Sequence, residues 1–293
     1  MANNTSAFNP EKWSPDIQNI LDKALVGKSI ANFEYQSQLT EGTTIHVPYI
    51  GNLDANDYVD ADGATIQDIT PSDETLVINK TKDASFYVQE KDIIQNKYST
   101  AMLYKKRAAY ALRNVMDTQI LAEVANAGLS VTAGDLTGGS GTGAITATTS
   151  NIIEIFTAAM QKLQENNVTV EGTGDLFAVI TPKMANLITQ KMASGGFNVT
   201  DSALKNGYAG DFLGFQIYIS NNVYSPSTID YCMFGKKGCT AMVVQKKPTV
   251  FTTQAFASDG SPKIGKNYVT WDLYGGKTFQ IGAQEMVSVN IAQ

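Results

Sequence analysis

Hydrophobic residues follow a two-residue period between residues 42 and 90, which predicts strands. A first strand is predicted from the alternating apolar residues Ile45, Val47 and Tyr49. A second apolar run covers residues 76–88, where the apolar residues all occupy even-numbered positions. The connection between the two runs is acidic and rich in turn-forming residues. Two long strands with little core of their own are not stable in isolation. We therefore expect this hairpin to lie on another surface.

Residues 92–127 follow a helical period instead. Apolar residues recur at spacings of three and four, and Gly128 is the first glycine or proline that could stop the helix. A helix of about 35 residues would be roughly 50 Å long, whereas the usual globular helix has about 11–12 residues. The pattern predicts one rigid strut. Its apolar positions are Ile94, Tyr98, Ala101, Met102, Ala108, Ala109, Leu112, Val115, Met116, Ile120 and Val124.

The rest of the chain mixes helices and strands. A short helix is predicted from Ser14 to Leu25, with Gly27 as its stop, and residues 128–149 form a Gly/Ser/Thr-rich connection. Helices are then expected near 152–166 and 182–194, and strands near 176–180, 215–219, 229–234 and 241–244. The alternating pattern of strands returns from Thr249 to the end of the chain. There the odd-numbered positions are apolar at Phe279, Ile281, Val287, Val289 and Ile291.

The composition of the chain argues against several classes of protein. The net charge is -6, the pI is about 4.9, and Arg107 and Arg113 are the only arginines, which does not suit a free-standing nucleic-acid binder. No run of eighteen apolar residues predicts a membrane helix, and the start of the chain lacks the features of a signal peptide. We expect Cys232 and Cys239 to be buried thiols, and we expect no membrane partner.

The sequence contains few residues that could act in catalysis or bind a metal or cofactor. His46 is the single histidine, and two cysteines without further ligands make no four-ligand zinc site. Gly27-Lys28-Ser29 lacks the first glycine of a phosphate-binding loop, and the glycine-rich run 138–143 follows a helix, where a dinucleotide-binding loop would follow a strand. We therefore predict no catalytic residue, no metal and no cofactor.

Two charged clusters are candidates for contacts. The acidic cluster of the hairpin connection is Asp54, Asp57, Asp60 and Asp62. Its spacing misses the calcium-loop pattern, so we expect a solvated tip or a contact with lysine on another subunit; a divalent ion is the alternative. The basic cluster of the long helix is Lys105, Lys106, Arg107 and Arg113. It is either a solvated face or a surface facing packaged nucleic acid or a neighbouring subunit.

The order of these elements resembles the Hong Kong 97 phage capsid fold, an α+β fold. Three local segments also resemble that family: Gly42-Thr43-Thr44-Ile45-His46-Val47-Pro48; Asp211-Phe212-Leu213-Gly214-Phe215-Gln216-Ile217-Tyr218-Ile219-Ser220-Asn221-Asn222; and Tyr274-Gly275-Gly276-Lys277. The resemblance implies an N-terminal arm (1–34), an extended hairpin or E-loop (35–90), a peripheral domain with its spine helix (91–144), and a mixed axial domain (145–241). Residues 242–293 are then C-terminal strands that return to the peripheral domain.

The resemblance also implies a function. The chain would be a major capsid protein that assembles into hexamers and pentamers of an icosahedral shell enclosing double-stranded DNA. Its partners would be further copies of itself, a portal protein and packaged DNA bound without sequence specificity. A separate scaffolding protein is expected because the chain lacks a long N-terminal extension. The expected location is the virion, with assembly in the host cytoplasm.

Three alternatives remain. An encapsulin-like compartment of the same fold would enclose enzyme cargo in place of a genome. A tail-tube or surface-layer subunit would lack the long helix. An enzyme with an α/β core would need a catalytic constellation, and the scarcity of histidine and arginine argues against one.

Overall fold

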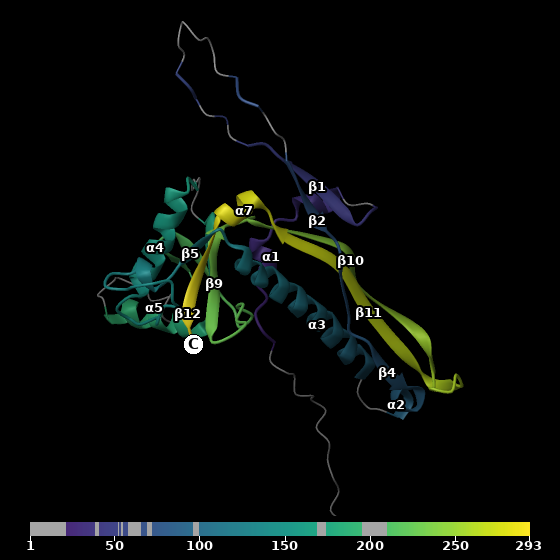
Figure 1. Ribbon diagram of the computed structural model, residues 1–293. Helices are drawn as coiled ribbons and strands as arrows, with labels where there is room; N and C mark the ends of the chain where they lie inside the picture. Colours follow the sequence, from purple (N-terminus) through teal and green to yellow (C-terminus); the bar gives the residue numbers. More distant parts are fainter. Residues whose placement is uncertain are drawn as a thin grey trace, which may run out of the picture.

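The computed structural model describes residues 22–38, 41–51, 53, 55–57, 66–68, 72–95, 100–168, 174–194 and 210–293. Figure 1 shows an elongated molecule. A two-stranded hairpin leaves one end, a long β-ribbon extends to the opposite end, and a helix-covered sheet lies to one side.

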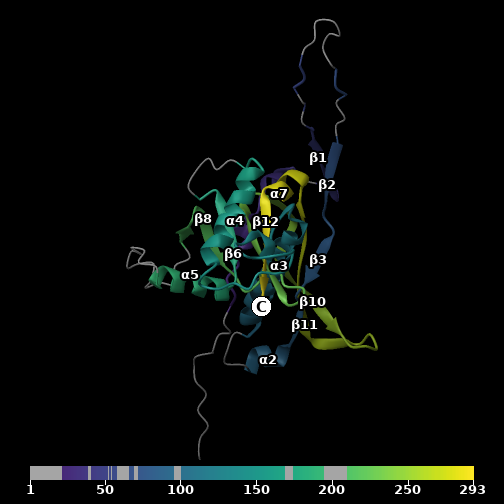
Figure 2. The same ribbon diagram turned by 60° about the vertical axis from the view of Figure 1, so that its left-hand side comes forward.

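The larger sheet has six strands in the order β5-β12-β9-β6-β8-β7. Its central strand β6 (Leu176–Ile180) is buried at every residue. It pairs in parallel with β8 and antiparallel with β9. One face packs on α4 (Ile152–Glu165) and α5 (Pro182–Ser194), which lie together in Figure 2. The other face packs on the end of α3 through Phe177 and Val179. Burial of both faces explains the unbroken apolar run of β6. The remaining strands are β5 (Leu129–Val131), β7 (Asp211–Phe212), β8 (Phe215–Ile219), β9 (Ile229–Lys236) and β12 (Met286–Ala292).

A second sheet is built on the ribbon of β10 (Thr240–Phe256) and β11 (Pro262–Thr278). Strands β3 (Lys80–Asp83) and β4 (Phe86–Gln89) both pair with the far edge of β11. Helix α3 (Thr100–Ala122) runs along the ribbon in Figure 1, and the Lys105 Nζ atom lies 4.7 Å from the centre of the Tyr268 ring. The ribbon and helix together form a stiff bar.

The long helix predicted over residues 92–127 is only partly present. Within the predicted span the structure describes α2 (Glu90–Gln95) and α3, and residues 96–99 between them lie outside the described residues. At the other end a 3-10 turn, η3 (Glu123–Asn126), follows α3, and Ala127 is extended. The Glu123 carboxylate accepts a hydrogen bond from the Thr278 backbone, which draws this last turn onto β11.

The second strand predicted over residues 76–88 is divided among three strands. Only β2 (Ser72–Val77) pairs with β1 (Thr44–Tyr49) to form the hairpin, while β3 and β4 belong to the ribbon sheet. A constant apolar phase does not reveal this change of partner, because Leu76 of β2 and Phe86 and Val88 of β4 keep the same parity, while β3 between them is exposed along its length.

Two terminal predictions are also corrected. Phe279 and Ile281 do not extend a strand, because α7 (Gln280–Gln284) follows Phe279 and the chain turns there. Strand β12 then pairs with β5 and β9 in the six-stranded sheet. Near the start, residues 22–26 are not helical and α1 (Gly27–Ile30) begins at the expected stop; the rest of the predicted helix lies outside the described residues. Short 3-10 turns, η2 (Glu34–Ser37) and η4 (Ala133–Asp135), complete the fold.

Candidate assembly surfaces

A polar junction fastens the N-terminal segment to α3. Asp22 forms an ion pair with Arg107, and the Lys23 backbone N–H donates to the Tyr110 hydroxyl over 2.6 Å. Further along, the backbone N–H of Gly27 donates to Asp117 Oδ1 over 2.6 Å. The segment is thus bonded to α3 at three positions along the helix.

Asn222 connects the same junction to the six-stranded sheet. Its Nδ2 atom donates to Asp117 Oδ2 and to Asn114 Oδ1, both over 2.8 Å, while its Oδ1 atom accepts from Lys23 Nζ over 2.9 Å. Asp117 is 3% exposed and Asn222 is 5% exposed. Buried polar groups satisfied in this way fix the mutual position of the segments that hold them.

The structure separates the four basic residues predicted as a cluster. Arg107 is paired with Asp22, and Lys105 lies over the Tyr268 ring. Lys106 and Arg113 are exposed, seven residues apart on one face of α3. That these residues meet DNA or a neighbouring subunit stays a prediction.

The hairpin presents an exposed surface that is both apolar and acidic. Ile50 is 74% exposed and Ile66 is 92% exposed, and Asp57 is exposed as well. Asp54, Asp60 and Asp62 lie outside the described residues. At the base, His46 Nδ1 and Asp73 Oδ2 lie 2.5 Å apart on the solvent side.

The base of the hairpin is anchored to the body of the subunit by Glu74. Its carboxylate lies 3.2 Å from Lys277 Nζ and accepts the backbone N–H of Gln280 over 2.8 Å. The buried residues Ile45 and Leu76 pack there against Val243 of β10. The hairpin is therefore held only at its base within the described part of the subunit.

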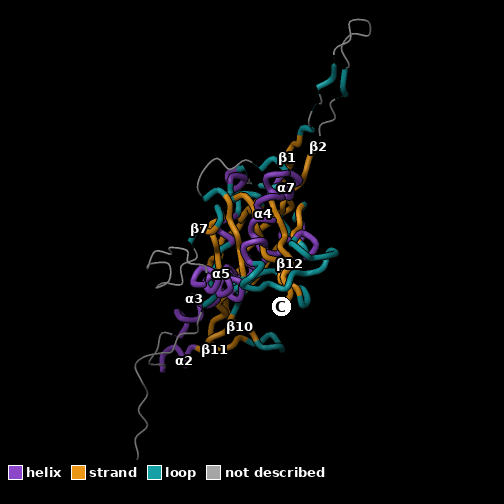
Figure 3. Tube along the Cα trace, turned by 90° about the vertical axis from the view of Figure 1, so that its left-hand side faces the viewer, coloured by secondary structure: helices purple, strands orange, loops and turns teal. Residues whose placement is uncertain are grey.

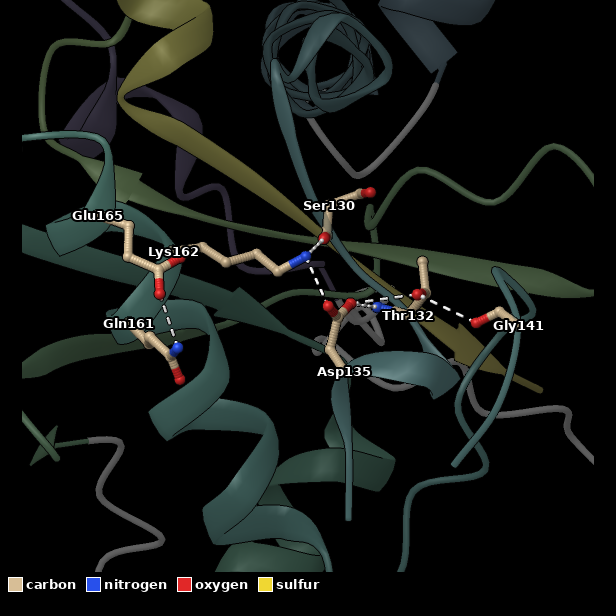
Figure 4. A network of polar contacts seen from close by, with 7 residues as sticks. All are labelled: Ser130, Thr132, Asp135, Gly141, Gln161, Lys162 and Glu165. Carbon is tan, nitrogen blue, oxygen red and sulfur yellow. Dashed lines mark hydrogen bonds and ion pairs between the residues drawn. The ribbon is translucent and has the colours of Figure 1, made fainter. Parts of the chain in front are cut away.

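A second polar network, drawn in Figure 4, holds the glycine-rich connection on α4. Lys162 Nζ donates to the Ser130 carbonyl over 2.6 Å and lies 2.8 Å from Asp135 Oδ1. Burial acts to raise the pKa of Asp135, but hydrogen bonds from Lys162 and Thr132 outweigh it and the pKa lies below its ordinary value. Thr132 also caps η4, so the loop that the sequence presents as flexible is fixed at its start.

The described residues form no group of three or more His, Cys, Asp or Glu that could hold a metal ion. Cys232 and Cys239 are free and buried, and burial raises the pKa of each thiol to about 12. At such a pKa the thiolate needed for nucleophilic chemistry is scarce. Among the described residues, no helix is both long and apolar enough to span a membrane.

Residues 73–277 match a family model described as phage capsid protein. The chain belongs to this family. Comparison with curated proteins finds no match.

Solved structures share the fold of this chain over nearly its whole length. A chain of Mycobacterium phage Che8 is similar at 21% identity and TM-score 0.79, with 98% of each chain covered. The capsid of the cyanophage P-SCSP1u gives 13% identity and TM-score 0.74, covering 100% of this chain and 96% of that one. The capsid of a native GTA particle gives 14% identity and TM-score 0.68, covering 99% and 97%.

The family match and the structures confirm the Hong Kong 97-like α+β capsid fold and the interpretation of a major capsid protein of tailed phages. Such a subunit is a structural protein of the virion and assembles with copies of itself. The matches are to phage capsids, and none of them points specifically to an encapsulin-like compartment.

Sequence reasoning found part of these surfaces. Asn222 ends the segment Asp211–Asn222 that resembles the family, but its partner Asp117 was missed. A signal was present, because Asp117 follows Met116 on the apolar side of a helix. A carboxylate in that position needs a buried partner.

Proposed function

We propose that copies of this chain form hexamers and pentamers that close into an icosahedral shell around double-stranded DNA. The single observation that carries this proposal is full-length likeness to a chain of the cyanophage P-SCSP1u capsid, with TM-score 0.74 over 100% of this chain and 96% of that one. The bar of α3 and the ribbon supports it further, because a wide thin shell needs subunits that resist bending.

The hairpin would provide the main contact between copies. It is a two-stranded sheet that projects from the body and exposes apolar residues such as Ile50 and Leu53. A hairpin of two strands is marginal in water unless something covers it. A neighbouring copy supplies that cover, and Asp57 would meet lysine there.

The role proposed is structural and has no catalytic step. DNA would be enclosed without sequence-specific contacts, since the chain carries a net charge of -6 and only Lys106 and Arg113 of the predicted basic cluster are exposed on α3. A separate scaffolding protein and a portal protein are proposed as further partners, with assembly in the host cytoplasm before the subunit enters the virion.

Expression of the chain alone, followed by negative-stain electron microscopy and sedimentation velocity, tests this function. We expect closed shells, rings of five or six subunits, or sheets of such rings. Shells that carry a host enzyme would favour a protein compartment. A chain that stays monomeric at high concentration, also with the scaffolding protein present, would contradict the proposal.

A further inference from the structure

The polar junction at Asn222 brings an amine and a carboxylate to the two ends of one side-chain amide. Lys23 Nζ lies 2.9 Å from Asn222 Oδ1, and Asp117 Oδ2 accepts a hydrogen bond from Asn222 Nδ2 over 2.8 Å. Because a C=O bond is about 1.23 Å long, the Lys23 amine lies no more than about 4 Å from the amide carbon Cγ. A nucleophile, an acyl carbon and a proton acceptor are therefore already adjacent.

The backbone of Lys23 is held at this place by α3. Its N–H donates to the Tyr110 hydroxyl over 2.6 Å, and this hydroxyl lies 3.4 Å from the Lys23 carbonyl oxygen, to which it donates. One residue earlier, Asp22 pairs with Arg107. The lysine side chain thus extends to Asn222 from a fixed base. Fixed reactants lose less freedom on reacting, which lowers the barrier to bond formation.

The amide group of Asn222 is fixed as well and is shielded from water. Its Nδ2 atom donates to Asp117 and also to Asn114 Oδ1 over 2.8 Å, so the nitrogen faces α3 and the oxygen faces Lys23. Asn222 is 5% exposed and Asp117 is 3% exposed. The end of α3 just beyond Asp117 packs on the six-stranded sheet, whose strands are orange in Figure 3. Charges act more strongly on their neighbours where water is excluded.

A second lysine lies near a side-chain amide in a simpler setting. Lys237 Nζ lies 2.5 Å from Gln216 Oε1, which also accepts from the Tyr218 hydroxyl over 2.9 Å. Within the described part of the chain, no carboxylate is bonded to the amide nitrogen of Gln216. Both pairs have a lysine close to an amide, but of the two only Asn222 has a buried carboxylate on the nitrogen that would leave.

We propose that Lys23 and Asn222 form an isopeptide bond within the subunit and that Asp117 transfers the proton. The neutral Lys23 amine attacks Cγ of Asn222, a new C–N bond forms, and one amine proton passes to the Asp117 carboxylate. Asp117 gives this proton to Nδ2, the bond from Cγ to Nδ2 breaks, and ammonia leaves. The atoms balance without an oxidant, a reductant or a further reactant. The reaction occurs once in each chain and turns over no substrate.

The bond would fasten the N-terminal segment to the body of the subunit. Its two residues are 199 positions apart in the chain. A covalent link across a long loop restricts the unfolded chain and so favours the folded state. Because both residues belong to one subunit, the bond is independent of the proposed shell function and is measured on the unassembled chain.

Mass spectrometry of the purified subunit tests the bond directly. We expect an intact mass about 17 Da below that of the sequence, because one ammonia is lost. Trypsin cannot cut at a lysine whose amine is acylated, so we expect residues 13–28 to appear joined to residues 206–236. A folded wild-type subunit with the full mass and no joined peptide would overturn the proposal.

Lys23→Arg is the matched variant. It keeps a cation beside Asn222 Oδ1, but a guanidinium group does not attack an amide. We expect the full mass, no joined peptide and a melting temperature below that of the wild type. The control Lys237→Arg should still lose ammonia. A joined peptide that persists in Lys23→Arg would show that another group forms the link, and would contradict the assignment to Lys23.

Asp117→Asn tests the proton transfer. The joined peptide is followed over time in newly synthesised chains, with circular dichroism to establish that the variant is folded. We expect its formation to slow by roughly a hundredfold or more, the usual effect of losing a group that transfers protons. Formation at the wild-type rate in a folded Asp117→Asn subunit would overturn the role of Asp117.

Discussion

At the scale of single residues, β11 carries polar groups that are buried without hydrogen-bond partners. Thr270 Oγ1, both carboxylate oxygens of Asp272 and the Tyr274 hydroxyl lack a partner at ordinary hydrogen-bond geometry within the described part of the chain. Burial raises the pKa of Asp272, and the Lys82 backbone and ammonium opposite it on β3 offset this only partly. Burial, followed by the charge of Asp272, raises the pKa of Tyr274 to about 12.

Asp272 therefore makes the subunit more stable on the acid side. Its pKa in the folded state lies above the unfolded value, so protonation favours folding. This contribution is fully present below the unfolded pKa and is lost as the pH rises through the folded pKa. We expect Asp272→Asn to raise the free energy of unfolding at neutral pH by about 1 kcal/mol, since it removes a buried charge that the Lys82 backbone and ammonium offset only partly.

Urea unfolding of the unassembled subunit at a series of pH values measures this effect. The difference between Asp272→Asn and the wild type should shrink towards acid pH. A variant that is less stable than the wild type, with a deficit that grows with pH, would show that the carboxylate has a stabilising partner.

At the scale of elements, the base of the hairpin depends on a close backbone crossing. A Cβ atom added to Gly275 would lie 2.4 Å from the Val77 carbonyl oxygen and 3.0 Å from Ile78 Cα. This is the point where the chain leaves β2 and enters β3. Gly275 is therefore needed in the segment Tyr274–Lys277 because a side chain there would collide with the backbone of the chain that leaves the hairpin.

We expect Gly275→Ala to destabilise the subunit by about 1–3 kcal/mol, because the methyl group overpacks against backbone that cannot move independently. Gly143→Ala is a matched control, since nothing lies within 4 Å of its added Cβ. Thermal unfolding of both variants measures the difference. Equal melting temperatures for Gly275→Ala and the wild type would contradict the crossing.

At the scale of the whole molecule, charge is divided along the length of the subunit. The acidic hairpin leaves one end of the molecule, and the ribbon, which carries Lys246, Lys247, Lys263 and Lys266, extends to the other end (Figure 1). Opposite charges at the two ends favour head-to-tail encounter of copies and disfavour contact between like ends.

Assembly should therefore weaken as salt rises. Between about 0.1 M and 1 M salt the Debye length falls from about 10 Å to about 3 Å, which screens exposed charge pairs. We expect the rate of assembly, followed by light scattering, to fall over this range. Assembly that is unchanged or faster at high salt would show that apolar burial alone drives the contact.

The sequence by itself determined much of this protein. Strands β6, β8 and β9 and helices α4 and α5 lie where their patterns predicted them, because each has a burial pattern set by its own periodicity. The order of elements was enough to identify the α+β capsid fold. The burial of both cysteines also followed from composition and context.

Only the tertiary structure decided which elements are partners. Residues 76–88 read as one strand, yet β2 pairs with β1 whereas β3 and β4 pair with β11. Asp117 and Asn222 are 105 residues apart in the chain and 2.8 Å apart in the fold. Periodicity records which face of an element is buried and not what buries it.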